Sequence, residues 1–210
     1  MLHRTSALLR LAPHRAGIAL TIQAGGGLAI DSGLLAGDAA NAANLALSAA
    51  ATVLQFWVVR TLLQDLGHAL PDRPRFPAFF VMMLATTIGV LVGFVALVVP
   101  GIILMVRWSI ASPLVIGSGR PIFDAIGESW RATKKSFWAI FAVFALVYGA
   151  AALVAMAGAA VEFGLRTDPL VGLTLLNLGL VGGVTVGWYA AVAVYDCLRP
   201  GRDHLKQVFE

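Results

Sequence analysis

Residues 100–138 read PGIILMVRWSIASPLVIGSGRPIFDAIGESWRATKKSFW, and this stretch decides the fold. The chain that enters it carries no charge from Phe76 onward, and the uncharged run ends only at Val106. A single helix from Phe76 to Gly117 would be about 60 Å long, roughly twice the hydrocarbon thickness of a bilayer. The run must therefore turn back, and Pro100 and Gly101 predict the turn because this dipeptide is typical of turns.

Composition indicates a membrane protein. Of 210 residues, 59% are hydrophobic and only 12% are charged, whereas soluble domains are about 25% charged. One soluble core of this length could not bury so much apolar surface. The net charge is +4, but the basic residues cluster between apolar runs, which indicates membrane orientation rather than a nucleic-acid-binding surface. The single cysteine, Cys197, excludes an internal disulfide, and we expect a small buried residue there rather than a palmitoylation site.

The apolar runs predict one all-α membrane domain over residues 1–210, with six transmembrane helices and one amphipathic interfacial helix. The six predicted helices are residues 16–37, 42–66, 76–99, 102–117, 137–161 and 169–197. The first is the weakest, because its uncharged part ends at Asp31 and three consecutive glycines interrupt it. Three prolines within residues 71–77 predict a loop between the second and third helices.

Residues 121–136 form the predicted interfacial helix. Charged residues recur at helical spacing on one face, and apolar residues occupy the other face. The alternative is a polar-faced extension of the following transmembrane helix. We expect contact with anionic lipids of the cytoplasmic leaflet through basic residues and interfacial tryptophans. The predicted lipid-contact residues are Trp130, Arg131, Lys134, Lys135 and Trp138.

Six crossings place every cluster of lysine and arginine on the same side of the membrane. The positive-inside rule makes that side cytoplasmic, with both termini inside. Arg4, Arg10 and Arg15 precede the first predicted helix. An arginine-rich, acid-poor beginning is also found in organelle transit peptides, but we favour a basic flank of the first helix because an apolar run follows directly.

The central stretch resembles a bacterial membrane family, the YciC-like proteins and the membrane domain fused to glycerophosphodiester phosphodiesterases. The shared features are a Pro-Gly pair, a basic residue, a proline, an Ala-x-x-x-Ser-Trp-x-x-Thr-Lys segment and a later tryptophan. Here these are Pro100, Gly101, Arg107, Pro113, Ala125, Ser129, Trp130, Thr133, Lys134 and Trp138. Residues 117–119 read Gly-Ser-Gly where the family often has an acid, so no role of that acid is carried over. The resemblance implies a fold and the bacterial inner membrane rather than a reaction.

Four ionisable residues lie within or near the predicted membrane helices: Asp31, Arg60, Arg107 and Asp196. Such residues are functional candidates by default, because charge is costly in a bilayer. Asp31 and Arg107 would each lie about 9 Å from the same face, which predicts an ion pair. Arg60 and Asp196 approach the other face and form a second predicted pair. Structural pairing or snorkelling is favoured over a transport or ligand site.

Small residues recur every fourth position in three helices, at Gly33 and Gly37, at Gly89 and Gly93, and at Gly179, Gly183 and Gly187. Stripes of this kind let membrane helices approach closely. We expect them to pack within the chain, with a homodimer face as the alternative.

The sequence shows no catalytic or metal-binding motif, and its histidines are scattered through terminal and loop segments. We therefore expect no catalytic residue, metal or cofactor. The predicted function is a non-enzymatic inner-membrane protein that acts as a scaffold for a membrane protein partner or in envelope-lipid maintenance. The alternative is a transporter for a small or lipid-like solute, with Arg107 and Asp31 lining its path.

Overall fold

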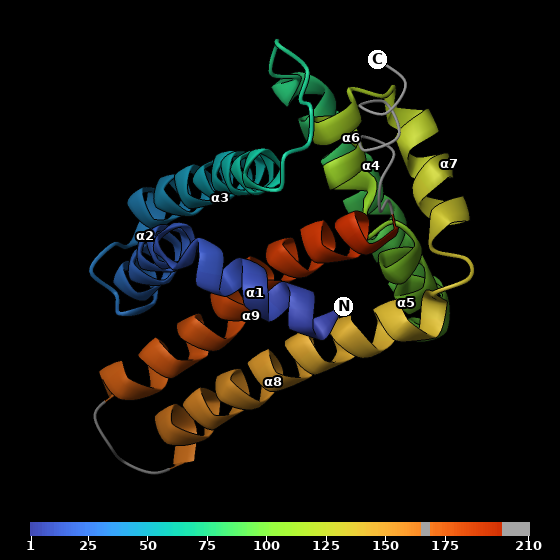
Figure 1. Ribbon diagram of the computed structural model, residues 1–210. Helices are drawn as coiled ribbons and strands as arrows, with labels where there is room; N and C mark the ends of the chain where they lie inside the picture. The colour runs from blue at the N-terminus through green and yellow to red at the C-terminus, as the bar shows by residue number, and fades with distance from the viewer. Residues whose placement is uncertain (165–168, 199–210) are drawn as a thin grey trace, which may run out of the picture. The chain divides into compact units, whose positions relative to one another are not determined.

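The computed structural model describes residues 1–164 and 169–198, which are helical and contain no strand (Figure 1). This confirms the predicted all-α class. The helices are α1 (Leu2–Leu11), α2 (Pro13–Asp31), α3 (Gly37–Asp65), α4 (Phe76–Ala96), α5 (Val98–Arg107), α6 (Ala111–Ser118), α7 (Ile122–Ala132), α8 (Phe137–Gly164) and α9 (Pro169–Leu198).

Five helical segments of the described chain are long and apolar enough to cross a membrane. They are Gly37–Asp65, Phe76–Ala96, Val98–Ser118, Phe137–Glu162 and Pro169–Leu198. They correspond to the predicted helices from 42–66 onward. The predicted first helix, 16–37, corresponds to α2, which is not among the five and which ends at Asp31. Five candidate crossings are thus present in the described chain, whereas the sixth crossing stays a prediction.

The chain divides into two compact units. Unit 1 comprises the described residues of Met1–Leu8, Phe56–Val143 and Tyr189–Glu210, and unit 2 those of Leu9–Gln55 and Phe144–Trp188. Unit 1 contains most of the large, fully buried side chains, such as Leu62, Phe79 and Tyr189.

In unit 1, α4 and α5 form the predicted hairpin, but its turn lies at Leu97 rather than at Pro100 and Gly101. Leu97 is extended, with φ −165° and ψ 146°. Pro100 lies in the first turn of α5, where helices tolerate a residue without an N–H group. A Cβ atom on Gly93 would lie 3.0 Å from the Cα of Gly101. These glycines therefore allow α4 and α5 to approach closely, as predicted for the stripe at Gly89 and Gly93.

The predicted helix 102–117 is two helices, because the chain unwinds over residues 108–110 between α5 and α6. Pro113 explains the break: proline cannot donate the backbone hydrogen bond to residue 109, and its ring would clash with that carbonyl. The predicted 121–136 helix ends earlier as α7, at Ala132. In unit 1, α7 contacts α4, α5 and α6.

In unit 2, glycines of α9 pack against α8. A Cβ atom on Gly179 would lie 2.5 Å from the backbone nitrogen of Ala155, and one on Gly183 would lie 2.6 Å from the Cβ of Ala151. Packing within the chain is therefore confirmed for this stripe. The prediction was wrong for Gly33 and Gly37, which have positive φ angles of 79° and 58° and no neighbour within 4 Å of an added Cβ. Gly33 lies in the turn between α2 and α3 and Gly37 at the start of α3, so they form no packing face.

Candidate functional site

Arg107 ends α5, and its guanidinium lies against two aromatic rings in unit 1. The guanidinium carbon is 5.3 Å from the ring centre of Trp130 and 5.3 Å from that of Phe137. Cations are attracted to the faces of aromatic rings at such distances. The Nη1 atom also donates to the carbonyl oxygen of Trp130, at 3.4 Å. The arginine is thus held by α7 and by the first residue of α8.

The backbone of Arg107 fixes α7 in place. The last carbonyls of a helix have no partner within that helix, and the Arg107 carbonyl accepts a hydrogen bond from the Ser129 hydroxyl at 2.7 Å. The Thr133 hydroxyl is 3.4 Å from the same oxygen. Ala125, Ser129 and Thr133 recur every fourth residue and are fully buried. The Ala-x-x-x-Ser-Trp-x-x-Thr segment therefore has a structural role that its sequence alone did not reveal.

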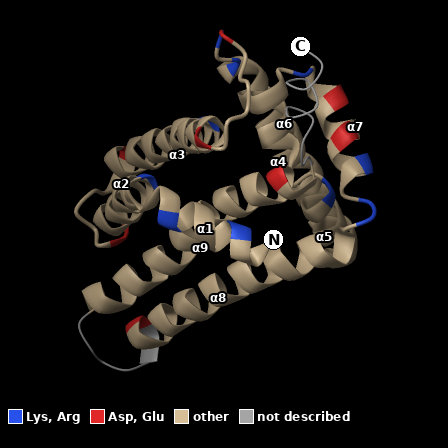
Figure 2. Cartoon of the chain, viewed as in Figure 1, with Lys and Arg blue, Asp and Glu red and all other residues tan. Residues whose placement is uncertain are grey.

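The opposite side of α7 is exposed, and its residue types divide into two sectors. At about 100° per residue, Phe123 and Trp130 fall in one sector, and Asp124 and Arg131 in the next. Phe123 is 84% exposed and Trp130 is 40% exposed. Figure 2 shows acidic and basic residues together along α7, whereas α8 is uncharged over most of its length. The helix thus presents an aromatic and a charged sector beside its buried stripe.

The predicted lipid-contact residues gather around the end of α7 and the start of α8. Arg131, Lys134, Lys135 and Trp138 are exposed, and Trp138 retains 76% of its accessible surface. We call these four residues with Trp130 the α7–α8 surface. Its contact with lipid stays a prediction.

A cavity of about 360 Å³ lies beside Arg107. Its other lining residues are all apolar and come from α5 and from the start of α8. They are Val99, Ile102, Ile103, Phe137, Trp138 and Phe141. Sequence reasoning missed this cavity, because it depends on how α5 and α8 lie beside each other.

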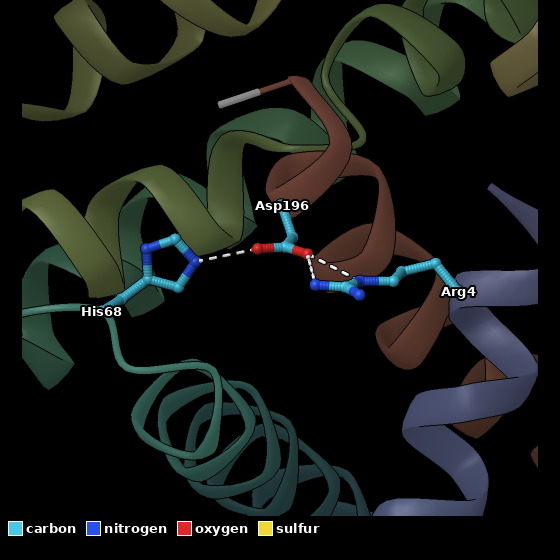
Figure 3. Close-up of polar contacts among 3 residues, drawn as sticks. All are labelled: Arg4, His68 and Asp196. Carbon is cyan, nitrogen blue, oxygen red and sulfur yellow. Dashed lines mark hydrogen bonds and ion pairs between the residues drawn. The ribbon is translucent and has the colours of Figure 1, made fainter. Parts of the chain in front are cut away.

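Asp196 is the centre of a second polar cluster in unit 1 (Figure 3). Two nitrogens of Arg4 approach its Oδ2 atom, at 2.7 Å and 2.8 Å, and the Nε2 atom of His68 lies 3.4 Å from Oδ1. The predicted pair of Arg60 with Asp196 was wrong: Arg60 donates instead to the carbonyl oxygen of Pro71, at 3.4 Å. This cluster could not be predicted from the sequence, because its members are far apart in the chain: they come from α1, the loop after α3 and the end of α9.

Asp31 and Arg107 have partners within their own units. The Asn177 side-chain nitrogen donates to Asp31 at 2.8 Å and to the Leu173 carbonyl at 3.1 Å. The predicted Asp31–Arg107 pair joins residues of the two units and stays a prediction. Asn177 is buried, and sequence reasoning missed it because it considered only ionisable residues.

Metal-binding geometry is not found in the described chain, where no three His, Cys, Asp or Glu residues lie close enough to hold an ion. Cys197, which we expected to be buried, is an exposed free thiol.

The part of the chain that contains the Arg107 site also matches a known family. Residues 72–174 match the membrane domain of glycerophosphoryl diester phosphodiesterase. The match spans just under half of the chain and includes all ten residues of the predicted resemblance. It supports the likeness to this membrane-domain family, whereas the likeness to YciC-like proteins stays a prediction.

No curated protein and no solved structure matches the chain significantly. The family match and the five apolar helices together identify a multi-pass integral membrane protein.

Proposed function

We propose that the chain is a non-enzymatic protein of the bacterial inner membrane that acts in envelope-lipid maintenance or as a scaffold for a membrane partner. The observation that carries the proposal is the α7–α8 surface, where exposed cations and tryptophans lie at the end of the docked helix α7, in the turn after it and at the start of α8. Basic side chains attract anionic headgroups, and tryptophans favour the membrane interface. The surface is therefore suited to an anionic leaflet.

The same proposal sets the orientation. α2 has 19 residues and is about 28 Å long. It can therefore serve as a sixth crossing, provided that its polar side chains contact protein and not lipid. Both termini and Lys134 then lie on the cytoplasmic side, in agreement with the positive-inside rule. A non-enzymatic role rests on the sequence, which has neither a Gly-x-Ser-x-Gly nor a His-Glu-x-x-His motif.

A transporter is the alternative function, and a polar cavity at Arg107 would favour it. The cavity beside Arg107 is apolar apart from the arginine itself. This lining is suited to hydrocarbon, so it does not favour a path for a small polar solute, and transport of a lipid-like solute stays the alternative.

Replacing Arg131, Lys134 and Lys135 with glutamine tests the proposed lipid contact. Each cation near an anionic leaflet contributes about 1 kcal/mol to lipid binding. We therefore expect the amount of anionic phospholipid that copurifies with the triple variant to fall by a factor of about ten or more. The measurement is the amount of each phospholipid and of each copurifying membrane protein per chain after mild detergent extraction from native membranes.

The matched control is R131K/K134R/K135R, which changes the same three side chains and keeps their charge. It should retain lipid and partners as the unmodified chain does. If the glutamine variant copurifies with unchanged lipids and proteins, the α7–α8 surface is not the contact site and the proposal fails.

A further inference from the structure

The cavity beside Arg107 has the chemical character of a site for one lipid chain. Its apolar residues extend along α5 from Val99 toward Arg107, over about 12 Å of helix. Phe137, Trp138 and Phe141 of α8 line it from the other side. Because Val99 and Trp138 are 65% and 76% exposed, the cavity borders the outside of unit 1. A hydrocarbon chain can therefore enter it from the surrounding lipid.

Arg107 brings a positive charge to this apolar cavity. Within the described chain, Arg107 forms no ion pair, and the acid Glu128 of α7 pairs with Arg120 at 2.9 Å. The Nε atom of Arg107 is buried without a hydrogen-bond partner. The two aromatic rings attract the cation but do not neutralise it. An uncompensated guanidinium beside hydrocarbon favours an anionic ligand, since guanidinium groups bind phosphate strongly.

We propose that the cavity binds one anionic phospholipid, with an acyl chain along α5 and the phosphate at the guanidinium of Arg107. The inference rests on the proposed lipid role and names the ligand class of one specific site within it. This site shares Trp138 with the α7–α8 surface but differs from it, because it needs an apolar volume as well as a charge. Its occupant is one tightly held lipid rather than a lipid layer.

A second cavity provides a matched comparison within the same chain. It has about 400 Å³, lies between α8 and α9 in unit 2, and is lined by apolar residues such as Val154 and Leu178. No charged residue lines it. By the proposed chemistry, this cavity should show no preference for anionic lipid.

The test is native mass spectrometry of the full chain in nanodiscs of equal parts phosphatidylglycerol and phosphatidylcholine. Both lipids carry a phosphate, but the choline cation of phosphatidylcholine offsets its charge, whereas phosphatidylglycerol stays net negative. We expect one retained phosphatidylglycerol per chain, at least about fivefold over phosphatidylcholine, because the choline cation is repelled by the nearby guanidinium of Arg107. Ile103→Trp projects a larger ring into the cavity without replacing Arg107, and it should abolish this bound lipid. Val154→Trp puts the same ring into the uncharged cavity of unit 2, and it should leave the amount of retained phosphatidylglycerol unchanged. Arg107→Met keeps a long apolar side chain and should abolish the preference.

The outcomes separate this proposal from the one on the α7–α8 surface. Unchanged phosphatidylglycerol retention in Ile103→Trp would overturn the cavity site, even if the triple glutamine variant loses lipid. Equal retention of the two lipids by the unmodified chain, or a preference that survives Arg107→Met, would overturn the headgroup contact. Loss of the single bound lipid in Ile103→Trp, with normal retention in Val154→Trp, would support the cavity site. This holds even if the triple glutamine variant retains as much lipid as the unmodified chain.

Discussion

Replacing Gly179 with alanine is expected to lower the free energy of unfolding by about 2 kcal/mol or more. The added Cβ would lie 2.5 Å from the backbone nitrogen of Ala155 and 2.8 Å from the carbonyl oxygen of Ala151. Both atoms belong to the backbone of α8, so no side-chain rotation can relieve the overlap. The two helices must separate, and close packing between small residues is what holds membrane helices together.

Gly182 provides the matched control, because it lies three residues along the same helix. The nearest atom to its added Cβ is a side-chain carbon of Leu20, at 4.0 Å, which is an ordinary contact. Alanine favours a helix over glycine by about 1 kcal/mol, so Gly182→Ala should leave stability unchanged or raise it. The measurement is unfolding of both variants in mixed detergent micelles. Equal stability of the two variants would contradict the packing of α8 against α9.

The long helices were predicted well, because the length of an uncharged apolar run can be read directly from the sequence. The predicted 137–161 and 169–197 helices agree with α8 and α9 to within three residues at each end. Sequence reasoning also predicted that the chain folds back between α4 and α5, since a straight helix would be too long for a bilayer. It misplaced the turn by three residues because proline also fits the first turn of a helix.

The candidate site was only partly accessible from the sequence. Arg107 and Trp130 were singled out, but their contact depends on α7 folding back against α5 across 22 residues of chain. The Arg4–Asp196 ion pair joins residues 192 positions apart. No helical periodicity relates residues so distant, so only tertiary structure could identify these partners. The predicted pair of Arg60 with Asp196 failed for this reason: similar depth along two helices does not imply contact.

Replacing Ser129 with alanine is expected to lower the free energy of unfolding by about 1 to 3 kcal/mol. Its hydroxyl is fully buried and donates to the Arg107 carbonyl at 2.7 Å. Alanine removes the donor but leaves the buried acceptor, whose other hydroxyl partner, Thr133, is at 3.4 Å. An acceptor without a good partner in a water-poor interior carries the full desolvation cost. The measurement is detergent-mediated unfolding, followed through the fluorescence of Trp130 in a chain whose other tryptophans are phenylalanine.

Ser48→Ala is the control, because Ser48 is exposed and its hydroxyl donates to the carbonyl of Asn44 in the same helix. Surface substitutions of this kind change stability by about 0.5 kcal/mol or less. Ser129→Ala should also loosen α7, which carries Trp130 away from the Arg107 guanidinium and makes its fluorescence easier to quench from water. A variant as stable as Ser48→Ala, with unchanged quenching, would show that the serine does not fix α7. The Arg107 cavity and the α7–α8 surface would then have to be positioned by the aromatic contacts and by the two longer hydrogen bonds, from Arg107 to the Trp130 carbonyl and from Thr133 to the Arg107 carbonyl.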